Sequence, residues 1–551
     1  MKVLSKKFRF VLFSAIVLVV AGCLNNTSLL RFYNYADKVF AATIIVSEDG
    51  KWKFSTDGEL YIYTGSETEV TLPEQLTSNG VTYNISKVTK FALLKNTTVT
   101  KINIGDNITF IADGSFMQMP NLEAIEVSET NTNYCDINGI LYNKAQTILL
   151  RFPQKNPAQT MEFPDSFIKC DDDALEICPN IQTLVIPAIY TGEEGDQTCI
   201  FSQRMFPNLT TIEVEQGNAN FSSESGILYN ADKTKLAWYP PKKADTDFTI
   251  PNSVTTIECN AFLNAVNLQN INLSANITDI DIFAFTGCNL TSLNSITTRA
   301  DYVNWNSPLK TVFQDNLAAF NTQPFSISLV EQEIQYAVDT YIEAGMSDYQ
   351  KIYALYNYAT NKVTYDSADM YAPENHCMSS LFLGNQTVCE GYALAMSLLL
   401  DKIGIPNCAV LNYNHAWDVL KLNDVWLLID ATWDDNDTEM AGKTYFLRTA
   451  AEYAPIHPAY TGICSSCLVS TNYSFGVDKS EYIDNLPVCD AIIGDLNMDG
   501  VLDSMDINCM GNEVQAYARY YQFGYYNVRA DMNRDGAINQ DDYNLLYEMV
   551  N

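Results

Sequence analysis

Apolar residues recur in a short repeated pattern through the first half of the chain. The clearest copy spans residues 250–273 and reads Ile-Pro-x-x-Val-x-x-Ile-x-x-x-Ala-Phe-x-x-x-x-Asn-Leu-x-x-Ile, and a related copy ends at Asn289 and Leu290. Each copy supplies a short strand with alternating apolar residues and a segment that turns back, so it can bury its apolar side only against neighbouring copies. The pattern predicts a solenoid over residues 60–322, after a lead-in segment at 24–59.

A longer repeat lies inside this region. A shift of 87 residues superimposes one stretch of the sequence on another without a gap. Matched positions include Asn121 with Asn208, Glu126 with Glu213, Pro153 with Pro240, Pro164 with Pro251, and the Gly-Ile-Leu-Tyr-Asn segments at 139–143 and 226–230.

The Ala-Phe and Asn-Leu positions, in a unit of about 23 residues, resemble the bacterial surface leucine-rich repeats of the BspA type. The Gly-Ile-Leu-Tyr-Asn segments resemble the β-hairpin inserts of that family. This resemblance implies a repeat domain that binds a protein, a peptide or another cell-surface ligand. It does not identify the ligand, because such repeats bind many partners.

Beyond residue 326 the apolar spacing becomes helical. Ile334, Val338 and Ile342 are spaced for one helix, and Ile352, Leu355 and Ala359 for a second. Residues 413–421 and 425–432 then alternate as two strands around an Asn423-Asp424 turn. These elements predict a new domain of mixed helix and strand over residues 326–461.

This domain contains the clearest chemistry of the chain. Cys389-Glu390-Gly391-Tyr392 leads into an apolar helix that ends near Gly404. A thiol at a helix N-terminus meets unpaired N–H groups and the positive end of the dipole, which favour the thiolate. His415 and Asp430 follow in the order expected for a base and the carboxylate that orients it.

The turn between the two strands decides whether His415 and Asp430 can meet. If the turn has two central residues, His415 lies opposite Thr432, and Asp430 lies two positions along on the same face of the sheet. A change of one residue in the turn would place them on opposite faces.

These residues resemble the transglutaminase-like cysteine domain, which implies an α+β fold of the papain type. By position, Cys389 would be the nucleophile, His415 the base and acid, and Asp430 the orienting carboxylate. The segments that carry the resemblance are residues 388–393, 404–406, 415–419, 426–434 and 445–447. Two positions depart from the family pattern: Asp418 stands where Asn is common, and Ala431 where Pro is common.

The resemblance implies an acyl-thioester formed from an amide. Water as acceptor gives hydrolysis, and a lysine amine gives cross-linking. Bacterial domains of this type are commonly regarded as peptidases, which favours hydrolysis. The chemistry requires no cofactor.

Other residues of this domain have less specific roles. The oxyanion hole would use the Cys389 N–H and a second donor, for which Gln386 is a candidate. His376 and His457 have no catalytic partners in the sequence pattern, so we expect surface or packing roles for both. Trp417 and Trp433 are expected to line the pocket or pack in the core.

The C-terminus contains two copies of a calcium-loop pattern. Ca²⁺ requires several oxygen ligands, a backbone carbonyl at loop position 7, and glycine at position 6 for a sharp turn. The expected ligands are Asp495, Asn497, Asp499, Val501, Asp503 and Asp506 in the first loop, and Asp531, Asn533, Asp535, Ala537, Asn539 and Asp542 in the second. We therefore expect two bound calcium ions.

A helix is expected after each loop, from Met505 onward and over residues 541–549. A duplicated loop and helix resembles a dockerin, a small α-helical module that binds cohesin domains of cellulosome scaffolds. By that resemblance Ser504, Met505, Gln540 and Asp541 would contact the cohesin, within a module over residues 493–551. A purely stabilising role for the two loops is the alternative. Residues 462–492 are expected to be a linker.

The N-terminus indicates export. Basic residues precede an apolar run over residues 10–21, as in a signal peptide. Val20-Ala21-Gly22-Cys23 resembles a lipobox, in which Cys23 would be acylated and residues 1–23 would include the signal. Ordinary secretion with cleavage near residues 39–41 is the alternative. The protein is expected outside the cell, on a cellulosome or the cell surface, with a lipid anchor as its only attachment to membrane.

Composition sets broad limits on partners. The 551 residues are 47% hydrophobic and 18% charged, which indicates a folded, multidomain α+β protein. A net charge of −33 excludes nucleic acid as a partner, because polyphosphate binding requires a basic face. The 14 cysteines show no compact disulfide framework.

Two functions from different classes remain open. The first is an exported cysteine enzyme with binding repeats and a docking module. The second is a surface-binding protein, attached to a cohesin scaffold, whose cysteine domain is inactive. The complete set of Cys389, His415 and Asp430 favours the enzyme.

Overall fold

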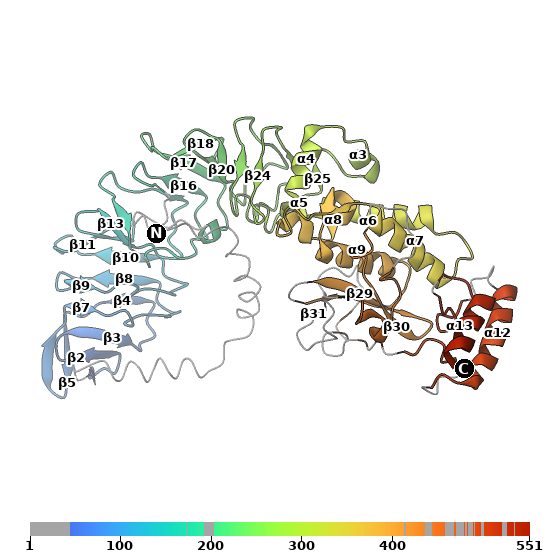
Figure 1. Cartoon of the computed structure of the whole chain (residues 1–551). Coiled ribbons are helices and arrows are strands. Elements are labelled where there is room, and N and C mark those ends of the chain that lie inside the picture. Colours follow the sequence, from blue (N-terminus) through green and yellow to red (C-terminus); the bar gives the residue numbers. More distant parts are fainter. Residues whose placement is uncertain are drawn as a thin grey trace. The chain divides into compact units, whose positions relative to one another are not determined.

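The computed structural model describes residues 44–171, 173–191, 203–412, 415–435, 444–457, 468–469, 479, 482, 487, 489, 491–496, 501–520, 526–533 and 535–550 (Figure 1). These residues fall into two compact units, each described separately below. The first comprises residues 44–158 and 163–180, and the second comprises 159–162, 181–191 and the described residues from 203 onward.

The first unit consists of short strands, in which parallel pairing joins successive repeats and antiparallel pairing forms the hairpins and the first strands. For example, β8 (Lys101–Ile104) pairs in parallel with β10 (Ala124–Val127) of the next repeat. The largest sheet has the order β1 (Ile44–Val46), β2 (Trp52–Ser55), β3 (Glu59–Tyr63), β7 (Lys87–Val88) and β9 (Phe110–Ile111). The other sheets are β10 (Ala124–Val127), β8 (Lys101–Ile104) and β4 (Glu69–Thr71); β5 (Gln75–Ser78) and β6 (Val81–Asn84); and β11 (Tyr134–Ile137), β12 (Ile140–Asn143), β13 (Ile148–Arg151) and β15 (Lys169–Cys170).

The lead-in expected at residues 24–59 is corrected by this arrangement. β1 and β2 pair antiparallel with each other, and β2 pairs with β3, so the repeat domain includes residues from Ile44 onward. Trp52 and Phe54 on β2 are buried in the core of the first unit. The apolar spacing missed these strands because they precede the repeated pattern.

The second unit begins with sheets of the same design. Strands β10 to β13 have counterparts 87 residues later in β17 to β20. The sheets are β14 (Thr160–Met161), β16 (Thr183–Ile186) and β17 (Thr211–Val214); β18 (Phe221–Glu224), β19 (Ile227–Asn230), β20 (Lys235–Trp238), β22 (Thr256–Ile257) and β24 (Asp279–Ile280); and β21 (Asp247–Thr249), β23 (Asn270–Asn272) and β25 (Ser292–Leu293), with a 3-10 turn at Gln203–Met205.

Both hairpins predicted within the repeats are present. β11 pairs antiparallel with β12, and β18 with β19. Asn138 and Gly139 have φ of 53° and 76°, and Ser225 and Gly226 have φ of 52° and 76°. Positive φ at both central residues is the geometry of a two-residue type I′ turn, which matches the twist of the strands.

A row of stacked aromatic rings extends from the core of the repeats to the helices that follow. Tyr239 lies 5.1 Å from Phe262 between ring centroids, Phe262 lies 5.1 Å from Phe285, and Phe285 lies 4.9 Å from Phe320. Phe320 is the last residue of α5 (Leu317–Phe320), which follows two other short helices, α3 (Arg299–Val303) and α4 (Pro308–Asp315). These helices separate the repeats from the next domain.

The domain after the repeats packs helices against an antiparallel sheet. α9 contacts β28 and β29 along the sheet, and α6 and α7 contact α9 (Figure 1). The helices are α6 (Pro324–Tyr341), α7 (Asp348–Thr360), α8 (Ser379–Leu383), α9 (Cys389–Lys402) and α10 (Ala450–Tyr453). The sheet has the order β30 (Val425–Ile429), β29 (Ala416–Leu422), β28 (Asn407–Leu411) and β31 (Leu468–Val469); β26 (Thr364–Tyr365) pairs with β27 (Gln386–Thr387), and a 3-10 turn covers Pro373–His376.

The segment 462–492, expected to be a linker, belongs instead to this domain at its described residues. β31 pairs with β28, and the Cys489 carbonyl accepts a hydrogen bond from the Ala450 N–H. The Lys479 ammonium is buried and lies 3.0 Å from the Asp401 carboxylate, at the end of α9. The composition of the segment did not reveal these contacts, because each is made by only one or two residues.

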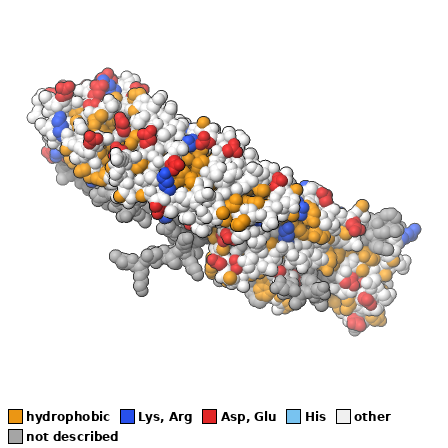
Figure 2. All heavy atoms as spheres, turned by 90° about the horizontal axis from the view of Figure 1, so that it is seen from above, with side chains coloured by type: hydrophobic (Ala, Val, Ile, Leu, Met, Phe, Trp, Pro, Cys, Tyr) orange, Lys and Arg blue, Asp and Glu red, His pale blue; other side chains and the backbone are white. Residues whose placement is uncertain are grey.

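The C-terminal region contains α12 (Ser504–Tyr520) and α13 (Gln540–Val550), which contact each other. Each begins within one residue of the expected start, at the end of one of the two loops expected to bind calcium. None of the described helices is both long and apolar enough to span a membrane. Acidic side chains are scattered over the face shown in Figure 2 and do not form a single patch.

Candidate active site

The thiol of Cys389 lies at the first residue of α9. The preceding residue, Val388, makes no side-chain cap, so the first-turn N–H groups remain directed toward this end of the helix. Ten of the fourteen α9 residues are buried, which fixes the helix on the sheet. The Cys389 side chain is half-buried and carries no disulfide.

Glycine at residue 391 allows the first turn of α9 to pack closely against neighbouring residues. A Cβ at residue 391 would overlap the hydroxyls of Thr387 and Ser380 and lie 2.8 Å from the Asn375 carbonyl oxygen. The hydroxyl of the next residue, Tyr392, lies 2.7 Å from Asp435 Oδ2 and 3.1 Å from the Val363 carbonyl oxygen. The Cys-x-Gly-Tyr sequence therefore serves to place the thiol.

The β29–β30 hairpin brings His415 and Asp430 together. Asn423 and Asp424 have φ of 47° and 62°, which identifies the expected two-residue turn. Its register runs from Leu422 opposite Val425 to Asp418 opposite Ile429, as that turn requires. The predicted geometry is confirmed: His415 Nε2 lies 2.5 Å from Asp430 Oδ2.

His415 interacts with both of the other groups, Asp430 and Cys389. Burial would lower the pKa of His415, but its hydrogen bonds with Asp430 and Cys389 raise the pKa to about 9. Burial would raise the pKa of Asp430, but hydrogen bonds from two imidazoles hold it below its usual value. The site therefore favours a charged imidazolium at His415 beside the ionised Asp430 carboxylate.

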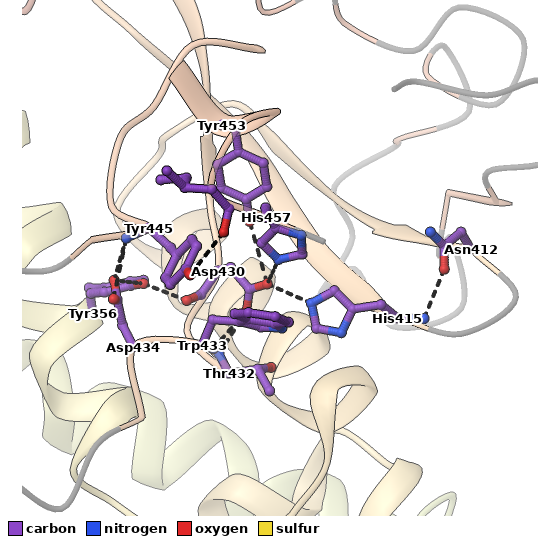
Figure 3. A network of polar contacts seen from close by, with 11 residues as sticks. Tyr356, Asn412, His415, Asp430, Thr432, Trp433, Asp434, Tyr445, Tyr453 and His457 are labelled. Carbon is purple, nitrogen blue, oxygen red and sulfur yellow. Dashed lines mark hydrogen bonds and ion pairs between the residues drawn. The ribbon is translucent and has the colours of Figure 1, made fainter. Parts of the chain in front are cut away.

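The surrounding residues fix the Asp430 carboxylate and main chain (Figure 3). Asp430 Oδ1 accepts the N–H groups of Thr432 and Trp433, at 2.9 and 3.2 Å. The Tyr356 hydroxyl contacts the Asp430 carbonyl oxygen and Asp434 Oδ2, each at 2.7 Å. Asp430 is fully buried, so these N–H groups replace the water that a free carboxylate would bind.

The packing role expected for His457 is corrected by the structure. Its Nε2 lies 2.8 Å from Asp430 Oδ2, the same oxygen that His415 contacts (Figure 3). His376 also has a partner near the site, because its Nδ1 lies 2.9 Å from Glu390, the residue after Cys389. Neither contact follows from the sequence pattern, because both histidines lie outside the α-helices and strands.

The remaining sequence candidates occupy different positions. Gln386 lies on β27 with an exposed side chain. Trp417 is buried in the small core beside β29, and Trp433 is half-buried with its ring 4.7 Å from His457. Asp418 is fully buried, and burial raises its pKa well above the usual value for an aspartate.

A metal ion is not needed to explain the cluster at Asp430. Among the described residues, His415, Asp430 and His457 are the group whose donor atoms are close enough to suggest a metal, within 4.8 Å of one another. Both nitrogens, however, lie 2.5 and 2.8 Å from one carboxylate oxygen. Ligands around a tetrahedral Zn²⁺ are separated by roughly 3.3 Å, so hydrogen bonds account better for these contacts.

The two C-terminal loops share one hydrogen-bond pattern. Asp506, at the last position of the first loop, accepts the N–H groups of Leu496 at 2.8 Å and Asp503 at 2.9 Å. Asp542 in the second loop accepts those of Met532 at 2.8 Å and Asn539 at 2.9 Å. The sequence repeat is therefore also a repeat of backbone structure.

The second loop has the residues that suit a cation. Gly536 has φ of 83°, as the sharp turn requires. Burial raises the pKa of Asp531 to about 6, and the neighbouring carboxylates Asp542 and Asp535 add to this increase. Buried carboxylates that repel one another suit Ca²⁺, which would neutralise them. Asn533, Ala537 and Asn539 lie in the same loop.

The first loop is described in part. Asp495 and Asp506 are buried, and Val501 is exposed. Asn497 and Asp499, like Cys23, lie outside the described residues. The four residues expected to contact a cohesin, Ser504, Met505, Gln540 and Asp541, are all exposed at the starts of α12 and α13.

Two family models match parts of the chain. A BspA type leucine rich repeat region matches in six copies over residues 68–155 and 242–334. The transglutaminase-like superfamily matches residues 336–433, which include Cys389, His415 and Asp430. No curated protein matches the chain.

Several solved structures are similar to parts of the chain. A leucine rich cell surface protein from Faecalibacterium prausnitzii is 19% identical, and the match covers 48% of this chain and 78% of that chain with a TM-score of 0.31. The pneumococcal vaccine antigen PcpA is 17% identical over 47% of this chain and 72% of that chain, with a TM-score of 0.28. A TGase is 17% identical over 26% of this chain and 38% of that chain, with a TM-score of 0.18.

The matched regions agree with the described architecture. The repeat matches cover stacked strands between β4 and β25 and extend through α3 to α5 into α6, and the transglutaminase-like match runs from the end of α6 to just beyond β30. The chain thus contains BspA-type leucine-rich repeats followed by a transglutaminase-like domain.

Proposed function

We propose that this protein is an exported cysteine enzyme that attacks amide bonds through an acyl-thioester. The observation that carries the proposal is the position of His415, which contacts Asp430 and interacts with Cys389 at the start of α9. A buried carboxylate and a thiol on either side of one imidazole are the arrangement needed to form and keep a thiolate.

The chemistry follows from where the protons lie. The Cys389 thiolate attacks the carbonyl carbon, and the His415 imidazolium then donates its proton to the departing amine as the C–N bond breaks. His415, now neutral, removes a proton from water, which attacks the thioester and releases the acid and the thiol. Asp430 holds the imidazole in one tautomer and stabilises its positive charge throughout. A lysine amine in place of water gives a cross-link.

Hydrogen-bond donors near the thiol would stabilise the oxyanion. The Cys389 N–H lies at the helix start and is one donor; the Gln386 side chain, on the neighbouring β27, is the candidate for the second. Its exposed side chain would have to turn toward the substrate carbonyl.

The other modules would supply location and targets. The repeats would bind a protein, a peptide or a cell-surface ligand, and the F. prausnitzii relative is itself described as a cell surface protein. The C-terminal loops would each bind Ca²⁺ and form a dockerin that attaches the protein to a cohesin of a cellulosome. The exposed residues at the starts of α12 and α13 support this role. Acylation of Cys23 would add a lipid anchor.

The competing function is a binding protein with an inactive cysteine domain. The matched repeats favour binding in either case, so the active site must decide between the two functions. We propose measuring iodoacetamide alkylation across pH in the full chain, with Cys389→Ala as the control. An enzyme should show rapid alkylation at pH about 6 that Cys389→Ala removes, because an ordinary thiol with a pKa of roughly 8.5 is almost fully protonated there. Alkylation of Cys389 at the rate of the other accessible thiols would favour the binding protein.

A further inference from the structure

A second imidazole contacts the carboxylate of the candidate triad. His457 follows α10 and is almost fully buried. Its main-chain N–H donates to the Tyr453 carbonyl at 3.0 Å. Its Nε2 lies 2.8 Å from Asp430 Oδ2, while His415 Nε2 lies 2.5 Å from the same oxygen. One carboxylate oxygen therefore accepts hydrogen bonds from two imidazoles.

The contact defines which nitrogen of His457 carries the proton. A carboxylate oxygen accepts, so Nε2 must donate. His457 Nδ1 is buried and has no hydrogen-bond partner among the described residues. A charged imidazolium would place a second N–H at that unsatisfied position, whereas the neutral Nε2–H form does not. The geometry therefore places a proton on His457 Nε2, from which it is donated to Asp430.

Aromatic neighbours fix the His457 ring in this orientation. The Tyr453 ring stacks on it at a centroid distance of 4.5 Å and an interplanar angle of 13°. The Trp433 ring lies 4.7 Å away, and the Tyr445 ring packs edge-on at 5.5 Å. The donor is thus held toward Asp430 before any substrate binds.

Asp430 is surrounded by donors on both oxygens. Oδ1 accepts hydrogen bonds from the backbone N–H groups of Thr432 and Trp433, and Oδ2 accepts hydrogen bonds from the two imidazoles. The Tyr453 hydroxyl adds a longer contact to Oδ2 at 3.4 Å. Without water around it, the carboxylate depends on these donors to remain charged.

We propose that His457 is a positioning residue for this site: its Nε2–H keeps Asp430 ionised and directed at His415, and thereby maintains the thiolate at Cys389. The inference rests on the proposed function, because it assigns to His457 a role in that same chemistry. His457 does not reach the thiol and acts through Asp430.

The electrostatics of the neighbouring groups agree with this role. Burial raises the pKa of Asp430, and the hydrogen bonds from His415 and His457 lower it below its usual value. Burial also raises the pKa of the nearby Asp418 well above its usual value. The tyrosines whose charged forms would interact with Asp430 also have raised pKa values and stay neutral; they are Tyr356, Tyr365, Tyr445 and Tyr453.

Two matched substitutions separate the hydrogen bond from the packing of the ring. His457→Phe keeps an aromatic ring but has no donor. His457→Gln has an amide N–H at a distance similar to that of Nε2. We would measure the rate of Cys389 alkylation by iodoacetamide between pH 4 and pH 8 in the full chain, using Cys389→Ala to identify the signal.

The diagnostic feature is the lower edge of the alkylation profile, which is the pH below which the alkylation rate of Cys389 falls. Loss of one donor raises the pKa of Asp430, so in His457→Phe this edge should move to higher pH by about one unit, a roughly tenfold loss of rate within that edge. His457→Gln should restore the wild-type profile. Tyr453→Phe removes only the longer contact and should shift the edge less. If His457→Phe does not fold, His457→Asn replaces it, because its shorter amide cannot reach Oδ2.

The possible outcomes are distinct. An unchanged lower edge in His457→Phe, or an equal shift in His457→Phe and His457→Gln, would overturn the role of His457 while leaving the enzyme proposal intact. If wild-type Cys389 itself reacts like an ordinary thiol, the proposed function fails, and this inference fails with it.

Discussion

The His415 side chain carries the charge on which the proposed chemistry depends. Its pKa is raised to about 9 by hydrogen bonds with Asp430 and Cys389 that outweigh burial. Because this is above the value of about 6.5 for a free histidine, the ion pair stabilises the fold fully below pH 6.5 and is lost as the pH rises through about 9.

A stability measurement tests this charge without a substrate. Between pH 6 and pH 9.5, the free energy of unfolding of the wild-type domain should fall by about 2–3 kcal/mol more than that of His415→Gln, whose amide does not titrate. Chemical denaturation followed by near-ultraviolet circular dichroism would give both values. An equal fall in the two proteins would mean that His415 is not charged at neutral pH.

At the scale of the element, the hairpin turns of the repeats depend on glycine. Gly139 and Gly80 have φ of 76° and 77° in two turns of the first unit. A Cβ at Gly139 would lie 2.8 Å from the Ala124 Cβ, whereas one at Gly80 would meet no atom within 4 Å. Gly80→Ala should therefore cost about 1 kcal/mol from the left-handed backbone alone, and Gly139→Ala about 2–3 kcal/mol. Equal costs by thermal denaturation would show that contact with Ala124 does not matter.

The elements that could be predicted are those whose pattern is local. The repeated strands, the hairpin turns, the helix from Cys389 and the β29–β30 register all follow from spacing within about 30 residues, which is where hydrophobic periodicity and turn residues are informative. His457 and Lys479 were missed because single buried polar residues in irregular segments leave no periodic signal. Their contacts to Asp430 and Asp401 form only after the chain has folded.

The Lys479 contact predicts that the segment after residue 461 stabilises the transglutaminase-like domain. Lys479→Met keeps the apolar stem but leaves the Asp401 carboxylate buried and without its cation, which should cost about 3 kcal/mol. Lys402→Met, at an exposed position of the same helix, serves as the control and should cost less than about 0.5 kcal/mol. Similar midpoints of urea denaturation for the two variants would restore the view of this segment as a linker.

The whole molecule combines three modules, which are the leucine-rich repeats, the domain with the candidate active site and the C-terminal region with two acidic loops. Buried carboxylates in the second loop predict that Ca²⁺ is required for folding of the C-terminal region. Chelation should therefore expose residues after 494 to limited proteolysis while the transglutaminase-like domain keeps its near-ultraviolet spectrum. Asp542→Ala should give the same cleavage in the presence of Ca²⁺. An identical digestion pattern with and without chelator would contradict this role of calcium.

The central claim is that Cys389 and His415 act as one unit, and the alkylation rate of Cys389 at pH 6 tests it most directly. Intact-mass spectrometry with peptide mapping would follow iodoacetamide addition to the wild type and to His415→Ala. We expect the wild type to react at Cys389 at least about tenfold faster than His415→Ala, because the imidazolium maintains the thiolate. Equal rates in the two proteins would show that His415 does not maintain a thiolate at Cys389.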